Sequence, residues 1–221
     1  MTGVRTRLQD LPAEFAVFPL PGALLLPRGR LPLNIFEHRY LAMTEDALAN
    51  GRMLAMIQPD PALPETANGP GLYRVGCLGR LSSFSETDDG RLLITLTGIA
   101  RFSIASEVDM RRGYRRVIGD FSRYHADFND PDDTPIDREG MIDALRGYFA
   151  RRSVEPNWDA INRLADDALV VTLAMVCPFE PIEKQALLEA PNEAERAETL
   201  LALLRMGAAD PGGAPTGHSV S

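Results

Sequence analysis

A β-hairpin is the clearest structural signal in the sequence, in the stretch VGCLGRLSSFSETDDGRLLITLT at residues 75–97. Leu92, Ile94 and Leu96 recur at every second position, as in a strand that buries one face. Asp89-Gly90 lies between the two apolar runs, and Asp-Gly is a preferred two-residue turn because both positions tolerate positive φ. The stretch therefore predicts two antiparallel strands joined by a tight turn.

Shorter apolar runs surround the hairpin and end in glycine, proline or charged residues. The further strands expected are residues 15–18, 24–26, 31–33, 53–57, 102–104 and 114–118. Gly98 and Ala100 are expected to interrupt the strand that follows the turn. About seven or eight short strands with one early helix predict a closed or nearly closed β-barrel, or a sandwich.

One helix is expected within this first half, between Asn34 and Gly51. Asn34 is the expected N-cap, Glu37 stands three residues later as in a capping box, and Gly51 is the expected stop. The residues expected to face inward are Tyr40, Leu41, Ala47 and Leu48.

The second half changes from strands to helices, which gives an α+β fold class. A barrel subdomain at residues 10–126 is expected to lead through a solvated acidic linker, 127–134, into a helical bundle at 135–206. The four helices expected there start at the N-cap Thr134, span Asn157–Val176, span Ile182–Ala190, and run from about Pro191 to Met206. Residues 207–221, rich in Gly, Pro and Ala, are expected to form a disordered tail.

Composition and charge limit the classes of function. The chain has 221 residues, 45% hydrophobic and 24% charged, as in ordinary globular proteins. Its net charge of −8 is uneven, because residues 1–126 carry 15 basic and 13 acidic side chains and residues 127–221 carry 8 and 18. Nucleic acid is therefore an unlikely general partner, since coating it needs a basic surface.

The cysteines and the apolar runs bear on location. Cys77 and Cys177 form no CxxC pair, which is typical of reduced core cysteines in a cytosolic protein. An apolar stretch at residues 15–26 follows two arginines, but acidic residues and prolines argue against a signal peptide. No run approaches the ~20 residues of a membrane span. We expect a cytoplasmic protein without a membrane partner.

No complete set of catalytic or metal-binding groups emerges from the sequence. Lys184, the single lysine, stands beside Glu180 and Glu183 and is expected to be a charged surface residue. The histidines lack metal-ligand spacing, and the linker carboxylates lack the glycine and glutamate of a calcium loop. No P-loop, GxGxxG or GxSxG motif occurs. We expect no catalytic residue, no metal and no cofactor.

An arginine cluster is the best candidate for nucleic-acid contact. It consists of Arg111, Arg112, Arg115 and Arg116, around Tyr114. Such a cluster can hold phosphates while the tyrosine stacks on a base. The alternatives are a basic edge strand that blocks edge-to-edge association, and an edge that docks on the acidic helical half of the chain.

Several motifs resemble the N-terminal substrate-binding domain of Lon proteases. They are FPLPGALLLPRGRLPLNIFEHRY at residues 18–40, GIARF at 98–102, Tyr114, and EKQALLE at 183–189. The resemblance covers about residues 10–206. It implies a PUA-like β-barrel followed by a helical bundle, and a stand-alone domain without the ATPase and Ser-Lys peptidase domains of full-length Lon. It also implies that any protease label is inherited from the family name.

The motif residues are interpreted as structural. The set comprises Phe18, Pro19, Leu33, Phe36, Glu37, Arg39, Tyr40, Gly98, Arg101 and Phe102. Phe18, Leu33, Ile35, Phe36 and Tyr40 are expected to fill the barrel core. Glu37 and Arg39 are two residues apart, so they are expected to lie on different helix faces without pairing, with Glu37 directed to Arg101.

The resemblance favours a non-catalytic module that binds polypeptide segments or a protein partner, with a role in protein quality control. The candidate contact residues are the loop 58–73 with Tyr73, the run Leu24, Leu25 and Leu26 if exposed, and the arginine cluster. The alternative is RNA or small-ligand binding through that cluster. A hydrolase is the third hypothesis, and the oligomeric state stays open.

Overall fold

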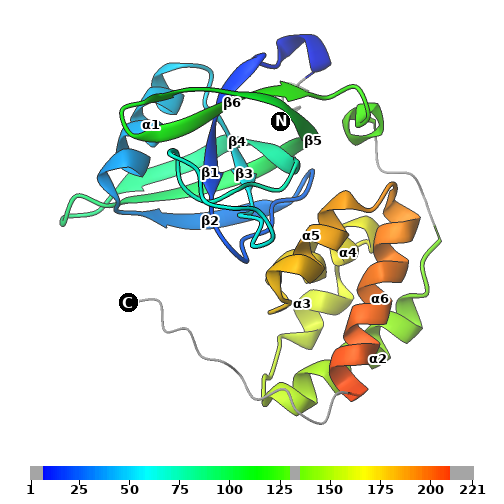
Figure 1. The fold of residues 1–221 in the computed structure, drawn as a ribbon. Coiled ribbons are helices and arrows are strands. Elements are labelled where there is room, and N and C mark those ends of the chain that lie inside the picture. The colour runs from blue at the N-terminus through cyan, green and yellow to red at the C-terminus, as the bar shows by residue number, and fades with distance from the viewer. Residues whose placement is uncertain (1–6, 130–134, 210–221) are drawn as a thin grey trace. The chain divides into compact units, whose positions relative to one another are not determined.

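The first part of the chain forms a closed β-barrel (Figure 1). The computed structural model describes residues 7–129 and 135–209. The strands are β1 (Glu14–Pro19), β2 (Arg30–Ile35), β3 (Met53–Ile57), β4 (Val75–Glu86), β5 (Leu92–Arg111) and β6 (Tyr114–Asp120). They follow the order β2-β5-β4-β3-β1-β6, and a further pairing of β5 with β6 closes the ring, with β2 added beside β5. The predicted barrel is confirmed, with six strands in the described chain rather than seven or eight.

Aromatic side chains fill the barrel interior. Phe15 of β1 and Phe102 of β5 meet edge to face, with ring centroids 4.9 Å apart, and Phe121 packs beside both. Val17 and Val117 are completely buried in the same cluster. Alternate residues of β1, β5 and β6 thus point into one core, as the period-2 pattern requires.

The predicted hairpin is confirmed, but its second strand does not stop at Gly98 and Ala100. β5 continues through both residues to Arg111. Gly98 lies directly opposite Gly79 of β4, and a Cβ on Gly98 would overlap the carbonyl oxygen of Leu26. This pair of glycines leaves the sheet surface bare, so that the loop before β2 can pack directly on the strands.

The apolar run Leu24–Leu26 is therefore neither a strand nor an exposed surface. Its three side chains are 2%, 1% and 0% exposed. Contact with a partner was expected only if this run stayed exposed, and that condition is not met, because the run packs on the glycine pair.

The first helix begins three residues later than predicted. α1 (His38–Ala49) has Glu37 as its N-cap, while Asn34 lies in β2 opposite Leu93 of β5. The ladder between β2 and β5 thus overrides the local capping signal. The buried residues of α1 are Tyr40, Ala42, Met43, Thr44 and Ala47, while Leu41 and Leu48 are half-buried. Phe36, expected in the core, is 53% exposed, and Leu33 is half-buried.

The helical part differs in detail from the prediction. Its helices are α2 (Arg138–Arg152), α3 (Trp158–Asn162), α4 (Asp166–Val176), α5 (Pro181–Glu189) and α6 (Glu193–Ala209). The single helix expected over Asn157–Val176 is two helices. Asp137 caps α2 by accepting a hydrogen bond from the Gly140 amide at 2.9 Å, and Thr134 lies outside the described residues. α6 includes residues 207–209 of the expected tail, whose remainder lies outside the described residues.

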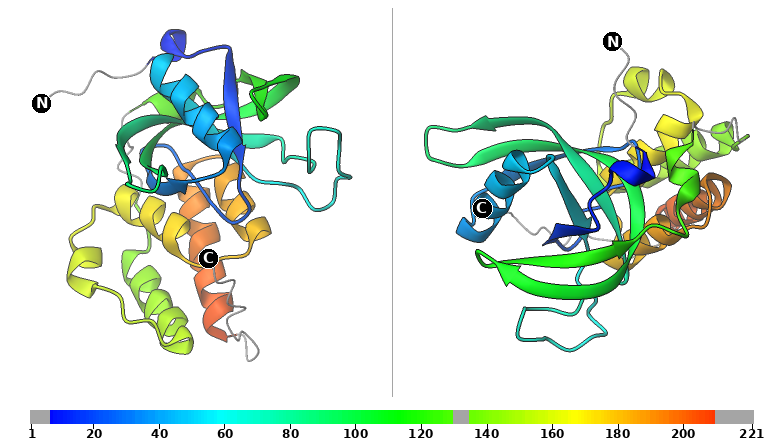
Figure 2. Two further views of the ribbon diagram at one scale, coloured as in Figure 1. Left: turned by 90° about the vertical axis from the view of Figure 1, so that its left-hand side faces the viewer. Right: turned by 90° about the horizontal axis from the view of Figure 1, so that it is seen from above.

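The chain divides into two compact units, which are considered separately. The first comprises Met1–Asp130 together with Met175–Glu189, so α5 packs with the barrel instead of the expected bundle. The second comprises Pro131–Ala174 and Ala190–Ser221. In it α2 packs along α6 (Figure 2), where Gly207 lets Tyr148 approach closely.

Candidate functional site

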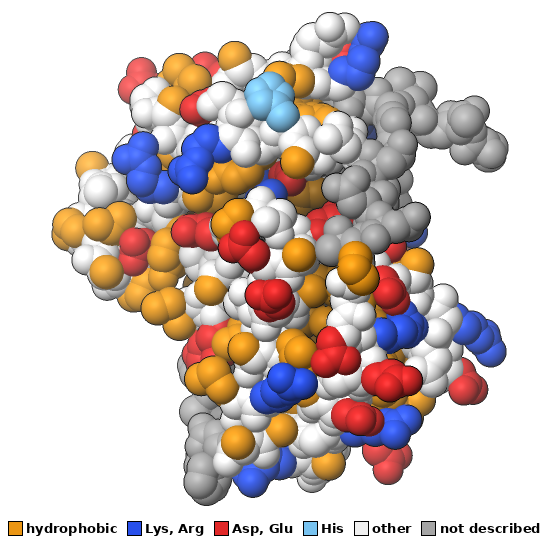
Figure 3. Space-filling model, turned by 90° about the vertical axis from the view of Figure 1, so that its right-hand side faces the viewer, with side chains coloured by type: hydrophobic (Ala, Val, Ile, Leu, Met, Phe, Trp, Pro, Cys, Tyr) orange, Lys and Arg blue, Asp and Glu red, His pale blue; other side chains and the backbone are white. Residues whose placement is uncertain are grey.

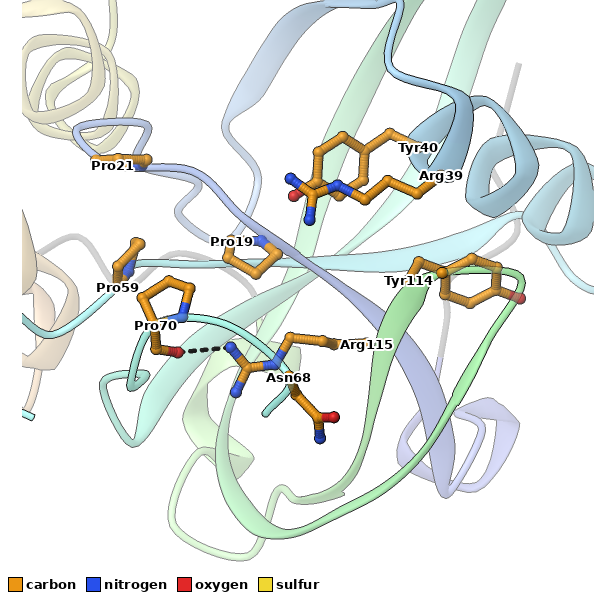
Figure 4. Close-up of a pocket in the computed structure, with 10 residues that line it drawn as sticks. Pro19, Pro21, Arg39, Tyr40, Pro59, Asn68, Pro70, Tyr114 and Arg115 are labelled. Carbon is orange, nitrogen blue, oxygen red and sulfur yellow. Dashed lines mark hydrogen bonds between the residues drawn. The ribbon is translucent and has the colours of Figure 1, made fainter. Parts of the chain in front are cut away.

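A pocket of about 180 Å³ opens on the barrel unit (Figure 4). Prolines dominate its wall, together with two tyrosines and two arginines. The described residues that line it are Pro19, Pro21, Arg39, Tyr40, Pro59, Asn68, Pro70, Gly113, Tyr114 and Arg115. No acidic side chain is among them. Pro19, Arg39 and Tyr40 come from the motif interpreted as structural, and Arg115 comes from the arginine cluster.

The segment from Gln58 to Tyr73, here called the arm, forms one side of this pocket. It extends away from the barrel in both views of Figure 2. Isolated bridges pair Pro59 with Leu72 and Thr66 with Gly69, so the expected loop is folded back on itself like a hairpin. Arg115 anchors it, because its Nη1 donates a hydrogen bond to the Pro70 carbonyl at 2.6 Å. Tyr73, a predicted contact residue, is half-buried at the base of the arm.

Arg39 and Tyr40 of the first motif form the opposite side of the pocket. The Tyr40 ring lies 4.1 Å from the ring of Phe18, between centroids, which fixes α1 to β1. Burial raises the pKa of the Tyr40 hydroxyl. The guanidinium of Arg39 lies over the same ring at 4.5 Å and extends towards the pocket (Figure 4). The pocket therefore combines an apolar wall with a cation at its mouth.

Glu37 and Arg39 pair with each other, contrary to the prediction. Nε and Nη2 of Arg39 lie 3.0 Å and 2.9 Å from Oε2 of Glu37. Helical spacing does not apply, because Glu37 is the N-cap and has extended backbone angles (φ −71°, ψ 133°). Its carboxylate makes no capping hydrogen bond. Glu37 is not paired with Arg101, whose carboxylate partner is Asp127.

The arginine cluster is neutralised by acidic side chains of the same unit. Arg115 is 5% exposed and pairs with Glu107, with Nη2 at 2.5 Å from Oε1. The others pair as Arg111 with Asp46, Arg112 with Glu45 and Asp46, and Arg116 with Glu14. The alternative that this edge docks on the acidic helical half is therefore not needed to balance its charge. The face in Figure 3 likewise shows basic and acidic side chains interspersed among the described residues.

Tyr114 shares the carboxylate that pairs with Arg111 and Arg112. Its hydroxyl donates a hydrogen bond to Asp46 at 2.7 Å. Burial, followed by this bond, raises the pKa of Tyr114 to about 12. The same bond is the main cause that lowers the pKa of Asp46. Tyr114 thus lines the pocket while its hydroxyl is held by Asp46.

A polar clamp joins α5 to the loop that carries Pro21. Lys184 is 8% exposed, and its Nζ donates hydrogen bonds to the carbonyl oxygens of Gly22 at 2.7 Å and Met175 at 3.4 Å. Burial lowers the pKa of Lys184. Gln58 links the same elements, since its amide accepts from the Gly22 N–H and donates to Gln185. The prediction of a solvated Lys184 is wrong, because its flanking glutamates indicate nothing about the carbonyl oxygen of Gly22, which is 162 residues away in the sequence.

The comparisons with known proteins agree with this architecture. The family described as "ATP-dependent protease La (LON) substrate-binding domain" matches residues 14–206. The chain belongs to the LON substrate-binding domain family. The Lon N-terminal domain protein from Xanthomonas campestris superposes with a TM-score of 0.57 and 22% identity, covering 86% of this chain and 97% of that one.

Relatives of this LON domain are much longer proteins. The Lon protease of Desulfosudis oleivorans is 27% identical over 92 residues, which are 41% of this chain and 11% of that protein. The Lon protease of Heliobacterium modesticaldum is 22% identical over 208 residues, which are 91% of this chain and 24% of that protein. The chain thus spans a quarter or less of the length of these relatives.

The GIARF element of the LON domain has a structural explanation. Gly98 provides the bare surface for the Leu24–Leu26 loop, and Phe102 fills the core. Arg101 is buried and pairs with Asp127, which was expected in a solvated linker. Its Nη1 also donates to the Leu188 carbonyl of α5 at 3.2 Å. Asp127 is therefore part of the barrel unit rather than a solvated linker residue.

The cysteines, the possible metal ligands and the apolar helices complete the description. Cys77 and Cys177 are buried and are not joined in a disulfide. In the described part of the chain, no three His, Cys, Asp or Glu side chains gather as a metal site. Residues 7–129 and 135–209 contain no helix with the length and apolar character needed to cross a membrane.

Proposed function

We propose that this LON domain binds exposed segments of polypeptides, with one apolar side chain seated in the pocket between the arm and α1. The observation that carries the proposal is the proline- and tyrosine-lined cavity of about 180 Å³. A dry engineered cavity of about 150 Å³ holds a benzene ring, so this pocket has room for one ring-sized side chain. It is smaller than the ~300 Å³ or more of usual small-molecule sites.

Polar groups beside the pocket suit a peptide backbone. Asn68 lines it from the arm, and a carboxamide can both donate to and accept from a peptide group. The arm exposes main-chain and apolar surface near by, including Leu63, which is 48% exposed. A folded protein offers few free segments of this kind, whereas an unfolded one offers many. We infer that non-native proteins are the ligands, in a quality-control role in the cytoplasm.

Binding of a fluorescently labelled, reduced and alkylated test protein would test the proposal by anisotropy. The unfolded form should bind and its folded form should not. Asn68→Trp should fill the pocket and weaken binding at least about tenfold, as expected for loss of one buried apolar anchor. Asn34→Trp places the same side chain on an exposed strand position outside the pocket and should bind normally. Equal binding by both variants would assign the ligand to another surface.

We propose binding without catalysis. Lys184, the amine that a Ser-Lys mechanism would need, is buried and bonded to two carbonyl oxygens. Purified protein should therefore release no peptide fragments from the unfolded test protein, with or without ATP. Appearance of fragments that is abolished by Lys184→Ala would refute this part. RNA binding is not favoured, because each arginine of the cluster has an acidic partner.

A further inference from the structure

The charge of the pocket lining suggests what accompanies the apolar side chain. Arg39 and Arg115 are the charged residues among the described lining side chains, and both are cationic. The guanidinium of Arg115 already has its partners, since it is buried against Glu107 and donates a hydrogen bond to the Pro70 carbonyl. Arg39 differs, because its side chain is 52% exposed and extends towards the cavity in Figure 4.

The present partner of Arg39 is easily exchanged. Glu37 contacts it through a single oxygen, Oε2, and is itself 46% exposed. Exposed ion pairs of this kind stabilise a fold only slightly. The Glu37 side chain also makes no capping hydrogen bond at the start of α1. A ligand carboxylate at the pocket mouth could therefore take the place of Glu37 without breaking the helix start.

We propose that the pocket selects polypeptide segments in which a carboxylate adjoins the seated side chain, and that this carboxylate displaces Glu37 from Arg39. The inference rests on the proposed function and specifies its ligand. Glu37 then acts as an internal competitor, while Arg39 determines specificity. The carboxylate can come from an Asp or Glu side chain or from the C-terminus of the segment, since both present the same group to a guanidinium.

Four labelled peptides would test the selection by anisotropy. Each has one Phe in a Gly-Ser background: one with Phe-Asp and an amidated end, one with Phe-Asn and an amidated end, and a pair ending in Phe as the acid or the amide. The wild type should bind at least one acid about threefold or more tightly than its amide. Which pair shows the preference identifies the source of the carboxylate.

Variants of the ion pair should change this preference in opposite directions. Arg39→Gln should abolish it, and Glu37→Gln should increase it, because the competitor is gone. Arg91→Gln is the matched control: Arg91 is 50% exposed and pairs with Asp89 two residues earlier, but does not line the pocket. Unfolding curves would show that all variants are folded.

Failure of the inference can be told from failure of the proposed function. Binding of all four peptides with no acid preference, or with a preference that Arg39→Gln leaves intact, overturns the role of Arg39 and leaves the polypeptide site standing. Absence of binding by every peptide and by the unfolded test protein overturns both.

Discussion

Arg101 and Asp127 form a bidentate ion pair that is almost completely sealed from water. Nε and Nη2 of Arg101 donate to Oδ2 and Oδ1 of Asp127 at 3.0 Å and 2.8 Å, and the two side chains are 4% and 7% exposed. The Arg101 amide also donates to Oδ2 at 2.9 Å. Asp127, seven residues beyond the end of β6, thus lies against the middle of β5 and holds this segment to the barrel.

Removal of one member of this buried ion pair should destabilise the fold strongly. Asp127→Ala leaves a buried guanidinium without its carboxylate, so we expect the free energy of unfolding to fall by about 3–5 kcal/mol. Urea denaturation followed by circular dichroism would measure it. Arg91→Ala, which breaks an exposed pair with Asp89, should cost at most about 1 kcal/mol. Similar losses in the two variants would contradict the structural role assigned to the buried pair.

Gly98→Ala should be more damaging than a usual single-methyl change. The new Cβ would overlap the Leu26 carbonyl, and the backbone there cannot move without separating the loop from the sheet. Overpacking of this kind costs about 1–3 kcal/mol or more. Thermal unfolding should show it, and Gly147→Ala offers a comparison because its nearest contact, the Ala208 methyl, is 3.2 Å away. An unchanged midpoint for Gly98→Ala would refute the close approach.

Lys184→Ala should destabilise the barrel unit through its two carbonyl partners. Gly22 and Met175 would lose a charged donor, and hydrogen bonds to charged groups contribute about 1.5–3 kcal/mol each at most. We therefore expect a clear fall in the urea midpoint. The same truncation at Arg30, which is exposed on β2, serves as the control and should have little effect. An unchanged urea midpoint for Lys184→Ala would mean that water replaces the amine.

Tyr114 should make the protein sensitive to alkali. Its pKa is about 12 in the folded state against 10.0 ordinarily, so between these values the unfolded chain loses a proton that the folded chain keeps. Stability from this group is complete below about pH 10 and declines as the pH rises towards 12. Tyr114→Phe should be less stable near neutral pH, because Asp46 loses a donor, yet show a shallower decline. Equal alkaline slopes of the urea midpoint in both proteins would refute this.

Regular features of the fold were predictable from the sequence. The 75–97 hairpin and the short strands follow from period-2 alternation and from Asp-Gly, which are local signals. The start of α1 was not, because Asn34 satisfies both a capping pattern and a strand pairing, and the pairing with Leu93 depends on a distant strand. Gly98 was misread for the same reason, since its partners are Gly79 and Leu26.

The candidate site was only partly predictable. The arm, Tyr40 and Arg115 were singled out, but Asn68 was not, because a lone asparagine in a loop carries no pattern. Lys184 and Asp127 were assigned to solvent from their charged neighbours in sequence. Their actual environments come from residues more than twenty positions away, Gly22 and Arg101. Long-range burial of a charge has no local signature.

The enclosure of Lys184 has a practical consequence for chemistry on this protein. It is the single lysine of the chain, and it is sealed between α5 and the loop at Gly22. Acylating reagents, amine cross-linkers and lysine-directed proteases would thus find no accessible side-chain amine on the native barrel unit. The extent of labelling at Lys184 would instead measure the fraction of molecules in which the barrel unit has unfolded locally or globally. The protein carries its own reporter of unfolding, readable by mass spectrometry without any engineered tag.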